Sequence, residues 1–564
     1  MKLIKIFCKN TGQYHEVPKG ATLEEIYPLI GLQETCCITS CKVNNRVEGL
    51  HYTINDSRDL EFLNLTSLSG LRTYTRSLFF VLYKATRDLF PGSNLRIGTP
   101  VAGGYYCHLE VEGGVTPEIA AQLRQRMVEI IDANIPFRRV TAHTTEAIEV
   151  FRQQGLTRKV QLLESIGDLY THYYILDDTV DYFYSALLLR TGQLSLFDLV
   201  TYGEGLLIRV PDPKQPQQLR PMTEQQQMFD VFQEQHRRQE ILGCTTVGEL
   251  NKAIRAGATN DLVNVAEALQ EKQIAKIADH IATHDHIKVV LIAGPSSSGK
   301  TTFSKRLSVQ LRACGKRPVS ISLDNYFVDR EATPLDENGD YDFETIEAVD
   351  LPLFNNQMSQ LISGHEVELP VFDFPSGKSR PSGKFLRLQP ETILILEGNH
   401  ALNPRMSEKI PAAAKYKIYA SALTTIMLDD HNYIPTSDSR LLRRICRDYK
   451  YRGYHPQEVI RRCASVTAGE EKWIFPFQEQ ADTMFNTALI YELAALRAQA
   501  LPLLEMVPES AEEYSEAYRL RKFISYFTPM PLDAVPPTSL LREFMGSSTD
   551  STCRADYSNC ISHK

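Results

Sequence analysis

The chain has 564 residues, of which 43% are hydrophobic and 23% are charged, and it carries a net charge of −8 with a pI of about 6.0. A chain of this length is too long for one hydrophobic core and predicts about three or four domains. The acidic balance excludes a global basic field of the kind that attracts nucleic acid, although a local basic patch is compatible with it.

The cysteines and the N-terminus indicate the compartment. None of the eleven cysteines forms a paired C-x-x-C array, so we expect buried thiols in a reducing environment rather than structural metal sites. Met1 to Phe7 begin no apolar signal-peptide segment. No run of about 18 apolar residues is present either. We therefore expect a soluble, cytoplasmic protein that does not contact the membrane.

Residues 1–65 have the pattern of a small β-rich unit. Lys2 to Phe7 alternate polar and apolar residues, as in a strand, and Ala21 to Ile30 have helical spacing with Thr22 as the N-cap. The sequence from Val43 to Leu63 resembles the TGS domain, the small β-grasp-like module at the front of threonyl-tRNA synthetases and some GTPases.

Residues 66–235 form a second region. A long helical pattern ends at Leu89-Phe90-Pro91, a glycine-punctuated strand follows, and Thr116 and Pro117 begin another helix. This order resembles the second domain of threonyl-tRNA synthetases, where editing occurs. That family has H-x-x-x-H metal ligands in the first helix, but Arg76 and Phe80 occupy those positions here, and neither side chain can ligate zinc. We expect no editing chemistry, while RNA or tRNA binding by these N-terminal modules stays open.

The clearest motif lies between Val289 and Phe303. An apolar run to Ala293 predicts a buried parallel strand, and G-x-x-x-x-G-K-T then leads into a helical pattern. Inward-facing N–H groups and the helix N-terminus favour phosphate, Lys300 can reach the β- and γ-phosphates, and the Thr301 hydroxyl can hold magnesium. The residues predicted to bind a nucleoside triphosphate are Gly294, Pro295, Ser296, Ser297, Ser298, Gly299, Lys300, Thr301 and Thr302.

Two further apolar strands end in acidic residues. Pro318 to Leu323 precede Asp324, and Thr392 to Leu396 precede Glu397. Ligands of doubly wound sheets lie beyond the carboxyl ends of the strands, so Asp324 can accept the proton of an attacking hydroxyl. Glu397 has the position of a magnesium-binding carboxylate. The alternatives are a turn-capping aspartate and a surface glutamate.

Arginines recur every three or four residues in the predicted helix from Asp438 to Asp448. They are Arg440, Arg443, Arg444 and Arg447, and Arg452 follows. A solvated basic face would have this pattern, but arginines after a P-loop core favour a lid that neutralises the transferring phosphate. Beyond them, a helix is predicted from Ala481 to Ala498.

Together these elements resemble the uridine kinase family of nucleoside kinases over about residues 285–500. The resemblance implies an α/β P-loop kinase with a parallel, doubly wound sheet that uses ATP and Mg²⁺. It implies that Asp324 is the general base and that Lys300, Arg447 and Arg452 are catalytic residues that bind phosphate. The substrate-binding residues that it implies are Tyr326, Asp342, Glu344, Phe372, Lys378, Arg380 and Arg444.

Three sites depart from the family pattern. Glu344 replaces a ribose-binding aspartate, Phe372 and the Gly377–Lys378 pair replace a tyrosine and a histidine that contact the base, and Tyr454 replaces a second lid arginine. A pocket with fewer polar groups discriminates less between bases, so we expect looser base selection.

The expected organisation has five segments. They are a TGS-like domain (1–65), a synthetase second-domain-like module (66–235), a helical linker (236–284), a kinase domain (285–544) and a disordered tail (545–564). The expected reaction is phosphorylation of the 5′-hydroxyl of a nucleoside, uridine or cytidine, by ATP in a homo-oligomer. Two alternatives stay open: a P-loop kinase of another small molecule, like phosphoribulokinase or pantothenate kinase, and a non-catalytic nucleotide-sensing or RNA-associated protein.

Overall fold

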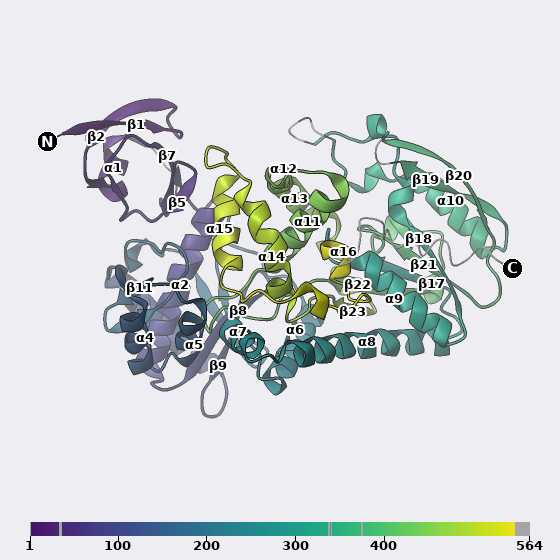
Figure 1. Cartoon of the computed structure of the whole chain (residues 1–564), viewed down its shortest axis with the longest axis horizontal. Coiled ribbons are helices and arrows are strands. Elements are labelled where there is room, and N and C mark those ends of the chain that lie inside the picture. The colour runs from purple at the N-terminus through teal and green to yellow at the C-terminus, as the bar shows by residue number, and fades with distance from the viewer. Residues whose placement is uncertain (1, 33–35, 337–338, 340, 374–375, 547–564) are drawn as a thin grey trace. The chain divides into compact units, whose positions relative to one another are not determined.

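The computed structural model describes residues 2–32, 36–336, 339, 341–373 and 376–546, which form two compact units (Figure 1). Unit 1 contains residues up to Ala256 together with Thr425–Pro435 and Leu501–Thr528. Unit 2 contains Gly257–Thr424, Thr436–Ala500 and the chain from Pro529. The chain therefore passes repeatedly between the units. The five segments predicted from the sequence have other boundaries and stay predictions.

The N-terminal part of unit 1 is a five-stranded sheet with the order β2-β1-β7-β4-β5. Its strands are β1 (Leu3–Cys8), β2 (Gln13–Pro18), β4 (Ser40–Val43), β5 (Arg46–Glu48) and β7 (Asp59–Leu63). The central strands β1 and β7 are parallel. Helix α1 (Leu23–Leu29) begins at Thr22, whose hydroxyl accepts the N–H of Glu25 while the Glu25 carboxylate accepts the N–H of Thr22. The predicted N-cap is thus confirmed.

The next part of unit 1 packs helices onto two antiparallel sheets. One sheet has the order β13-β14-β9-β8 and the other β10-β11-β12. The strands are β8 (Asn94–Val101), β9 (Gly104–Glu110), β10 (Arg138–His143), β11 (Tyr170–Leu176), β12 (Thr179–Asp181), β13 (Asp198–Tyr202) and β14 (Gly205–Arg209). The helices of unit 1 after α1 are α2 (Leu68–Leu89), α3 (Pro117–Asp132), α4 (Thr144–Gln153), α5 (Thr157–Ile166), α6 (Gln226–Ile241), α7 (Val247–Arg255) and α15 (Tyr514–Ile524). As predicted, Thr116 caps α3.

The two positions that the resemblance matched to metal-binding histidines, Arg76 and Phe80, are part of the packed core of unit 1. Arg76 is buried in α2, donates to the carbonyl of Ala186 at 3.2 Å and lies over the ring of Tyr184. Phe80 is fully buried and packs against Phe137 and Phe183. These two side chains therefore support the fold of unit 1.

Unit 2 is built on a five-stranded parallel sheet with the order β18-β21-β17-β22-β23, as expected for a P-loop α/β fold. The strands are β17 (Val289–Ala293), β18 (Arg317–Ser322), β21 (Thr392–Glu397), β22 (Lys415–Ser421) and β23 (Thr483–Asn486). All residues of β17 and β21 are buried. The prediction of a helix from Ala481 was wrong at its start, because residues 483–486 extend the sheet and Phe485 stacks on Phe303 in the core.

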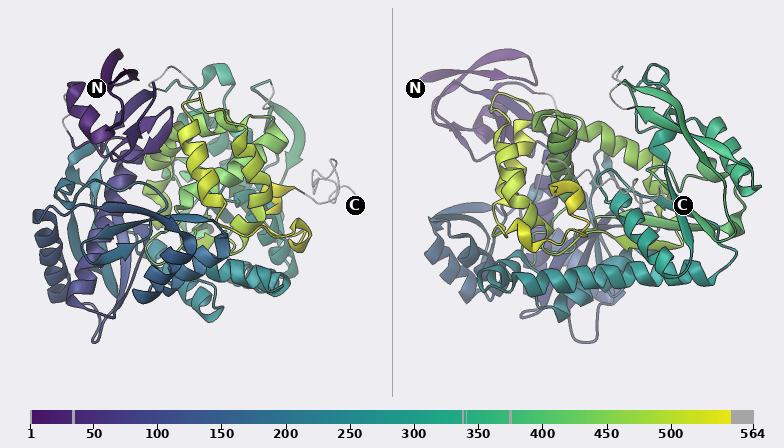
Figure 2. Two further views of the ribbon diagram at one scale, coloured as in Figure 1. Left: turned by 60° about the vertical axis from the view of Figure 1, so that its left-hand side comes forward. Right: turned by 45° about the vertical axis from the view of Figure 1, so that its right-hand side comes forward.

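Helices cover this sheet and surround its carboxyl end (Figures 1 and 2). They are α8 (Thr259–Thr283), α9 (Lys300–Ala313), α10 (Leu351–Ile362), α11 (Thr436–Arg452), α12 (Pro456–Arg461), α13 (Cys463–Trp473), α14 (Glu492–Glu505, which ends in unit 1) and α16 (Arg542–Met545). A hairpin of β19 (Val367–Asp373) and β20 (Lys378–Leu386) extends from the core. Met545, predicted to begin a disordered tail, is buried at the end of α16. Residues 547–564 of that tail lie outside the described residues.

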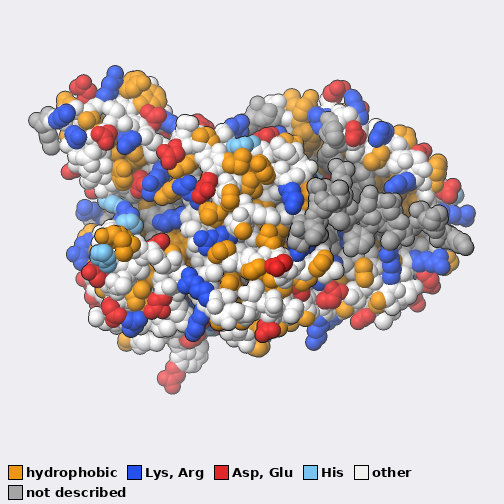
Figure 3. All heavy atoms as spheres, viewed as in Figure 1, with side chains coloured by type: hydrophobic (Ala, Val, Ile, Leu, Met, Phe, Trp, Pro, Cys, Tyr) orange, Lys and Arg blue, Asp and Glu red, His pale blue; other side chains and the backbone are white. Residues whose placement is uncertain are grey.

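The surface carries charges of both signs. On the face shown in Figure 3, basic and acidic side chains are interspersed, and no single-sign field covers that face. In the part of the chain that the structure describes, no helix is both long and apolar enough to cross a membrane.

A buried ion network holds residues 425–435 within unit 1. Lys159 contacts Asp181 at 2.6 Å and Asp429 at 2.7 Å, and the Nδ1 atom of His431 lies 2.8 Å from Asp181. All four side chains are almost fully buried. Burial lowers the pKa of Lys159, but the charges of the two aspartates outweigh this effect and hold the pKa above its ordinary value. Lys159 is therefore charged throughout the neutral range.

Replacing Lys159 should destabilise unit 1 strongly. Lys159→Ala leaves two buried carboxylates without their cation, and we expect a loss of about 3–5 kcal/mol in the free energy of unfolding. Urea unfolding followed by circular dichroism measures it. Arg152→Ala, which breaks an exposed ion pair with Glu164, is the control and should change stability by less than about 0.5 kcal/mol. Equal effects of the two substitutions would contradict the assignment.

Candidate active site

The loop between β17 and α9 has the conformation of a phosphate-binding loop. Gly299 has φ +86°, and Ser297 has φ 59°, so the loop makes two left-handed turns before α9 begins at Lys300. A Cβ atom on Gly294 would lie 1.9 Å from the carbonyl oxygen of Ala420, so only glycine fits there. Such turns are typical of loops whose N–H groups bind anions.

The loop contains polar groups that no protein group satisfies. The hydroxyl oxygens of Ser297 and Ser298 are buried and have no hydrogen-bond partner. The Lys300 Nζ atom donates to the carbonyls of Gly294 and Pro295, at 2.8 and 3.0 Å, and to the Asn399 side chain at 2.9 Å. Burial lowers the pKa of Lys300, and nearby carboxylates oppose the fall. Buried, unsatisfied hydroxyls beside a lysine suit an anionic ligand.

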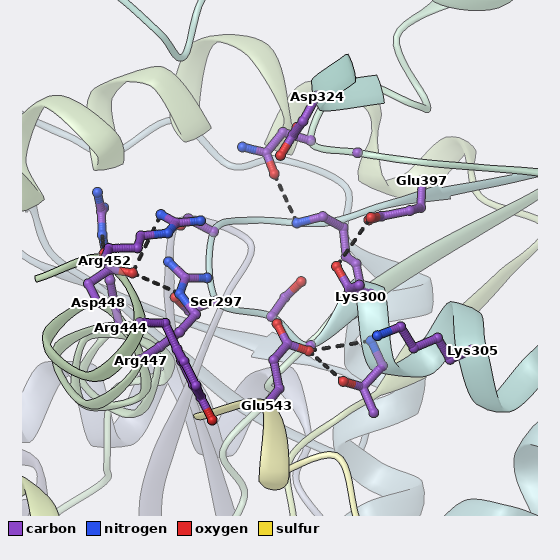
Figure 4. Close-up of a pocket in the computed structure, with 18 of the residues that line it drawn as sticks. Ser297, Lys300, Lys305, Asp324, Glu397, Arg444, Arg447, Asp448, Arg452 and Glu543 are labelled. Carbon is purple, nitrogen blue, oxygen red and sulfur yellow. Dashed lines mark hydrogen bonds and ion pairs between the residues drawn. The ribbon is translucent and has the colours of Figure 1, made fainter. Parts of the chain in front are cut away.

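A cavity of about 2990 Å³ lies over this loop, entirely within unit 2 (Figure 4). It is large enough for a nucleotide and a second small molecule together. The predicted site residues that line it are Ser296, Ser297, Ser298, Gly299, Lys300, Thr301, Thr302, Asp324, Glu344, Phe372, Glu397, Arg444, Arg447 and Arg452. Gly294 and Pro295 lie behind the loop, where their carbonyls accept from Lys300.

The two strand-end acids lie in the cavity as predicted. Asp324 follows β18, and burial raises its pKa, while nearby cations, Lys300 first, oppose the rise. Glu397 ends β21, and burial, followed by the charge of Asp324, raises its pKa to about 7. The Thr301 hydroxyl donates to Glu397 at 3.2 Å. Adjacent hydroxyl and carboxylate oxygens are the ligands that Mg²⁺ prefers, and a cation there would favour the charged form of both acids.

Glu344 and Phe372 form another part of the cavity wall. Burial and the charge of Glu470 raise the pKa of Glu344 to about 7, although Arg444 opposes the rise. The Glu344 carboxylate accepts a hydrogen bond from the Asn399 amide at 3.2 Å. The Phe372 ring meets that of Phe327 edge-on. A carboxylate and aromatic rings on the wall of one cavity suit a small molecule with both hydroxyl groups and a flat ring.

Four residues predicted to contact substrate do not line the cavity. Tyr326 is buried against α10, where its hydroxyl donates to Gln357 at 2.7 Å. Asp342 caps its own loop by accepting the N–H groups of Glu344 and Thr345. Lys378 is half-exposed and pairs with Asp329 and Glu331. Arg380 is exposed on β20. Turn formation and hairpin packing determine where these four side chains lie, and the sequence motifs contain no information about either.

The arginines of α11 divide into two groups. Arg444, Arg447 and Arg452 surround the buried Asp448 carboxylate, at 3.4, 2.8 and 3.4 Å, on the cavity wall (Figure 4). Arg440 instead forms a close pair with Glu470 of α13, and fully buried Arg443 pairs with Glu492. Only the first group can reach a ligand, so the predicted arginine face is partly structural.

Several polar residues of the site were not predicted from the sequence. Asn399 joins Lys300 to Glu344, and Glu470 accepts the N–H of Ser296 at 3.0 Å. Glu543 accepts both the N–H and the hydroxyl of Thr302. The one available signal was the position of Asn399 two residues after the strand-end acid. Glu470 and Glu543 come from helices far along the chain, and no motif identifies them.

The comparisons with known proteins divide the chain in the same way as the motifs. Residues 289–490 match the Phosphoribulokinase / Uridine kinase family. A uridine kinase from Lactobacillus helveticus is 29% identical over 195 residues, which are 34% of this chain and 83% of that protein. A solved structure titled as a possible uridine kinase, from Bacillus stearothermophilus, is 17% identical, with 36% of this chain and 89% of that chain covered and a TM-score of 0.26.

A threonine–tRNA ligase from Desulforamulus reducens is 31% identical over 166 residues, which are 29% of this chain and 26% of the ligase. A second, from Rubrobacter xylanophilus, is 29% identical over 33% of this chain and 29% of the ligase. The chain thus spans less than a third of the length of these ligases. The C-terminal half of the protein thus contains a region, residues 289–490, that matches the Phosphoribulokinase / Uridine kinase family, and its N-terminal region matches part of the threonine–tRNA ligases.

Proposed function

We propose that this protein transfers the γ-phosphoryl group of ATP to the 5′-hydroxyl of a nucleoside, with uridine or cytidine as the preferred acceptor. One observation carries the proposal. A single cavity in unit 2 is lined by the phosphate-binding loop, by two strand-end acids, by three arginines, and by a further carboxylate and aromatic rings. A kinase needs this combination, because donor phosphates and acceptor must meet in one enclosed space.

In this proposal the loop from Ser296 to Thr302 binds the donor. Its N–H groups and the Lys300 ammonium hold the phosphates, and the unsatisfied Ser297 and Ser298 hydroxyls offer further hydrogen bonds. Thr301 and Glu397 would hold Mg²⁺, which when bound neutralises phosphate charge. Arg447 and Arg452 stabilise the charge of the transferring group from the opposite wall.

Asp324 is the proposed general base. Its raised pKa brings it closer to the operating pH than that of an ordinary aspartate, and it lies beside Lys300 and the two arginines. The carboxylate accepts the proton of the acceptor hydroxyl as that oxygen attacks the γ-phosphorus and the bond to ADP breaks. Glu344 and Arg444 bind the ribose hydroxyls, and Phe372 provides a face for the base.

Removal of the proposed base should slow phosphoryl transfer without weakening the binding of ATP. Asp324→Asn keeps the shape of the side chain but cannot take the proton, so kcat should fall by roughly 10²–10⁴-fold. The Kd for ATP, measured by calorimetry, should stay within about threefold of the parent. Lys300→Ala is the contrast and should weaken both binding and turnover. Turnover by Asp324→Asn within a few-fold of the parent would exclude the assignment.

The pH dependence of kcat/KM for the acceptor should reflect the ionisation of Glu344. The pKa of Glu344 is about 7, so the hydrogen-bond-accepting carboxylate form dominates above that pH. With uridine as acceptor, kcat/KM should rise as the pH increases through about 7. Glu344→Gln should lower kcat/KM above pH 7 by about 10- to 100-fold. The profile of Glu344→Gln should keep only the part due to other groups. An unchanged profile would contradict the role.

Two other activities make different predictions. If the acceptor is another small hydroxyl compound, ATP consumption will require that compound and not a nucleoside. If the protein only senses nucleotides, it will bind ATP without turnover in a broad acceptor screen. Asp324 and Glu397 together favour chemistry, because a sensor has no need of a base.

The N-terminal region should lack editing activity. Arg76 and Phe80 fill the metal-ligand positions with packed side chains, and without a metal no hydroxide is generated at neutral pH. We expect the full-length protein to contain substoichiometric zinc by elemental analysis and to leave mischarged tRNA intact. Stoichiometric zinc together with deacylation would show this assignment to be wrong.

A further inference from the structure

The segment from Pro529 to Gly546 reaches the cavity although it lies outside the matched family region, residues 289–490. Its residues on the cavity wall are Pro537, Thr538, Ser539, Arg542 and Glu543. Arg542 holds the segment in a compact turn by donating to the carbonyls of Leu532 at 3.0 Å, Pro536 at 3.3 Å and Gly546 at 3.1 Å, and also to Val535.

The Glu543 carboxylate, from α16, contacts the first turn of α9. Its Oε2 atom accepts the Thr302 hydroxyl at 2.7 Å and the Thr302 backbone N–H at 3.3 Å (Figure 4). N–H groups in the first turn of a helix have no partner within the helix and attract negative charge. Glu543 thus takes two donors that belong to the predicted phosphate site.

Glu543 satisfies only some of the hydrogen-bond donors in this region. The buried hydroxyls of Ser297 and Ser298, in the same loop, have no partner. A carboxylate and a phosphate oxygen accept the same N–H groups, but two anions cannot share them without mutual repulsion in a cavity that also contains Asp324 and Glu397. A phosphate that enters this loop therefore meets Glu543 as a competitor.

We propose that residues 536–545 are part of the nucleotide site and that Glu543 is an internal competitor, which an incoming phosphate displaces from Thr302. The inference rests on the proposed binding of ATP to the loop. Displacement also reaches the arginine helix, because Lys450 of α11 donates to the Met545 carbonyl at 3.0 Å and Arg443 lies over the Phe544 ring. Nucleotide affinity is thereby lowered until the segment moves.

The test compares the full-length parent with two variants that each lose one negative charge from this segment. Glu543→Gln removes the competitor, and Asp533→Asn is the control, since Asp533 does not line the cavity. The Kd for ADP and for ATP, measured by calorimetry, should tighten by about 3- to 20-fold in Glu543→Gln. It should stay within about twofold of the parent in Asp533→Asn. Unchanged or weaker binding by Glu543→Gln would overturn the inference.

Hydrogen exchange in the unmodified protein provides a second measurement. Saturating ADP should speed exchange of the backbone amides of residues 536–545 if the segment is displaced, and slowed exchange there would count against displacement. Absence of nucleotide binding in the parent and both variants would overturn the proposed function and this inference together. Equal, tight binding by all three proteins would overturn the inference alone.

Discussion

The hydrogen-bond donors of the loop before α9 and of the first turn of α9 determine which side chains must surround the cavity of unit 2. Two left-handed turns, at Ser297 and Gly299, precede the helix, and the buried hydroxyls of Ser297 and Ser298 have no hydrogen-bond partner. Buried donors without acceptors cost free energy, so the surrounding structure supplies carboxylates: Glu470 at Ser296 and Glu543 at Thr302. Each carboxylate needs support of its own, and Arg440 provides it for Glu470.

This arrangement produces a cavity rich in acids as well as in cations. Asp324, Glu344 and Glu397 all have pKa values raised by burial, and the charge of Asp324 also raises the pKa of the other two. Adding phosphate groups would increase that repulsion unless cations accompanied them. The arginines around Asp448 and a divalent cation held by Thr301 and Glu397 would therefore act together to offset the repulsion between the phosphates and these acids.

The sequence was sufficient to predict those parts of the site that a local pattern defines. The phosphate-binding loop, Asp324 and Glu397 follow from apolar strands that end in particular residues, because strand ends of a parallel sheet meet at one edge. Glu470 and Glu543 were not predictable, since they come from helices whose packing depends on the whole of unit 2. The strand β23 was mistaken for helix because it is only four residues long and is followed closely by a helix that begins at Glu492. Lys378 and Arg380 lie outside the cavity wall because the pairing of β19 with β20, and not their spacing in the sequence, determines their positions.

The division into units was also beyond a linear analysis. Residues 425–435 belong to unit 1, where Lys159 holds Asp429, yet α11 begins at the next residue, Thr436, in unit 2. No single cut separates the units, so a boundary chosen from composition falls within a folded body.

Asn399 connects two parts of the site that lie far apart in the sequence. Its amide links Lys300, on the proposed donor side, with Glu344, on the proposed acceptor side, through hydrogen bonds of 2.9 and 3.2 Å. A change of charge at either end alters the field at the other, so donor and acceptor groups of this cavity form one electrostatic system and not two adjoining sites.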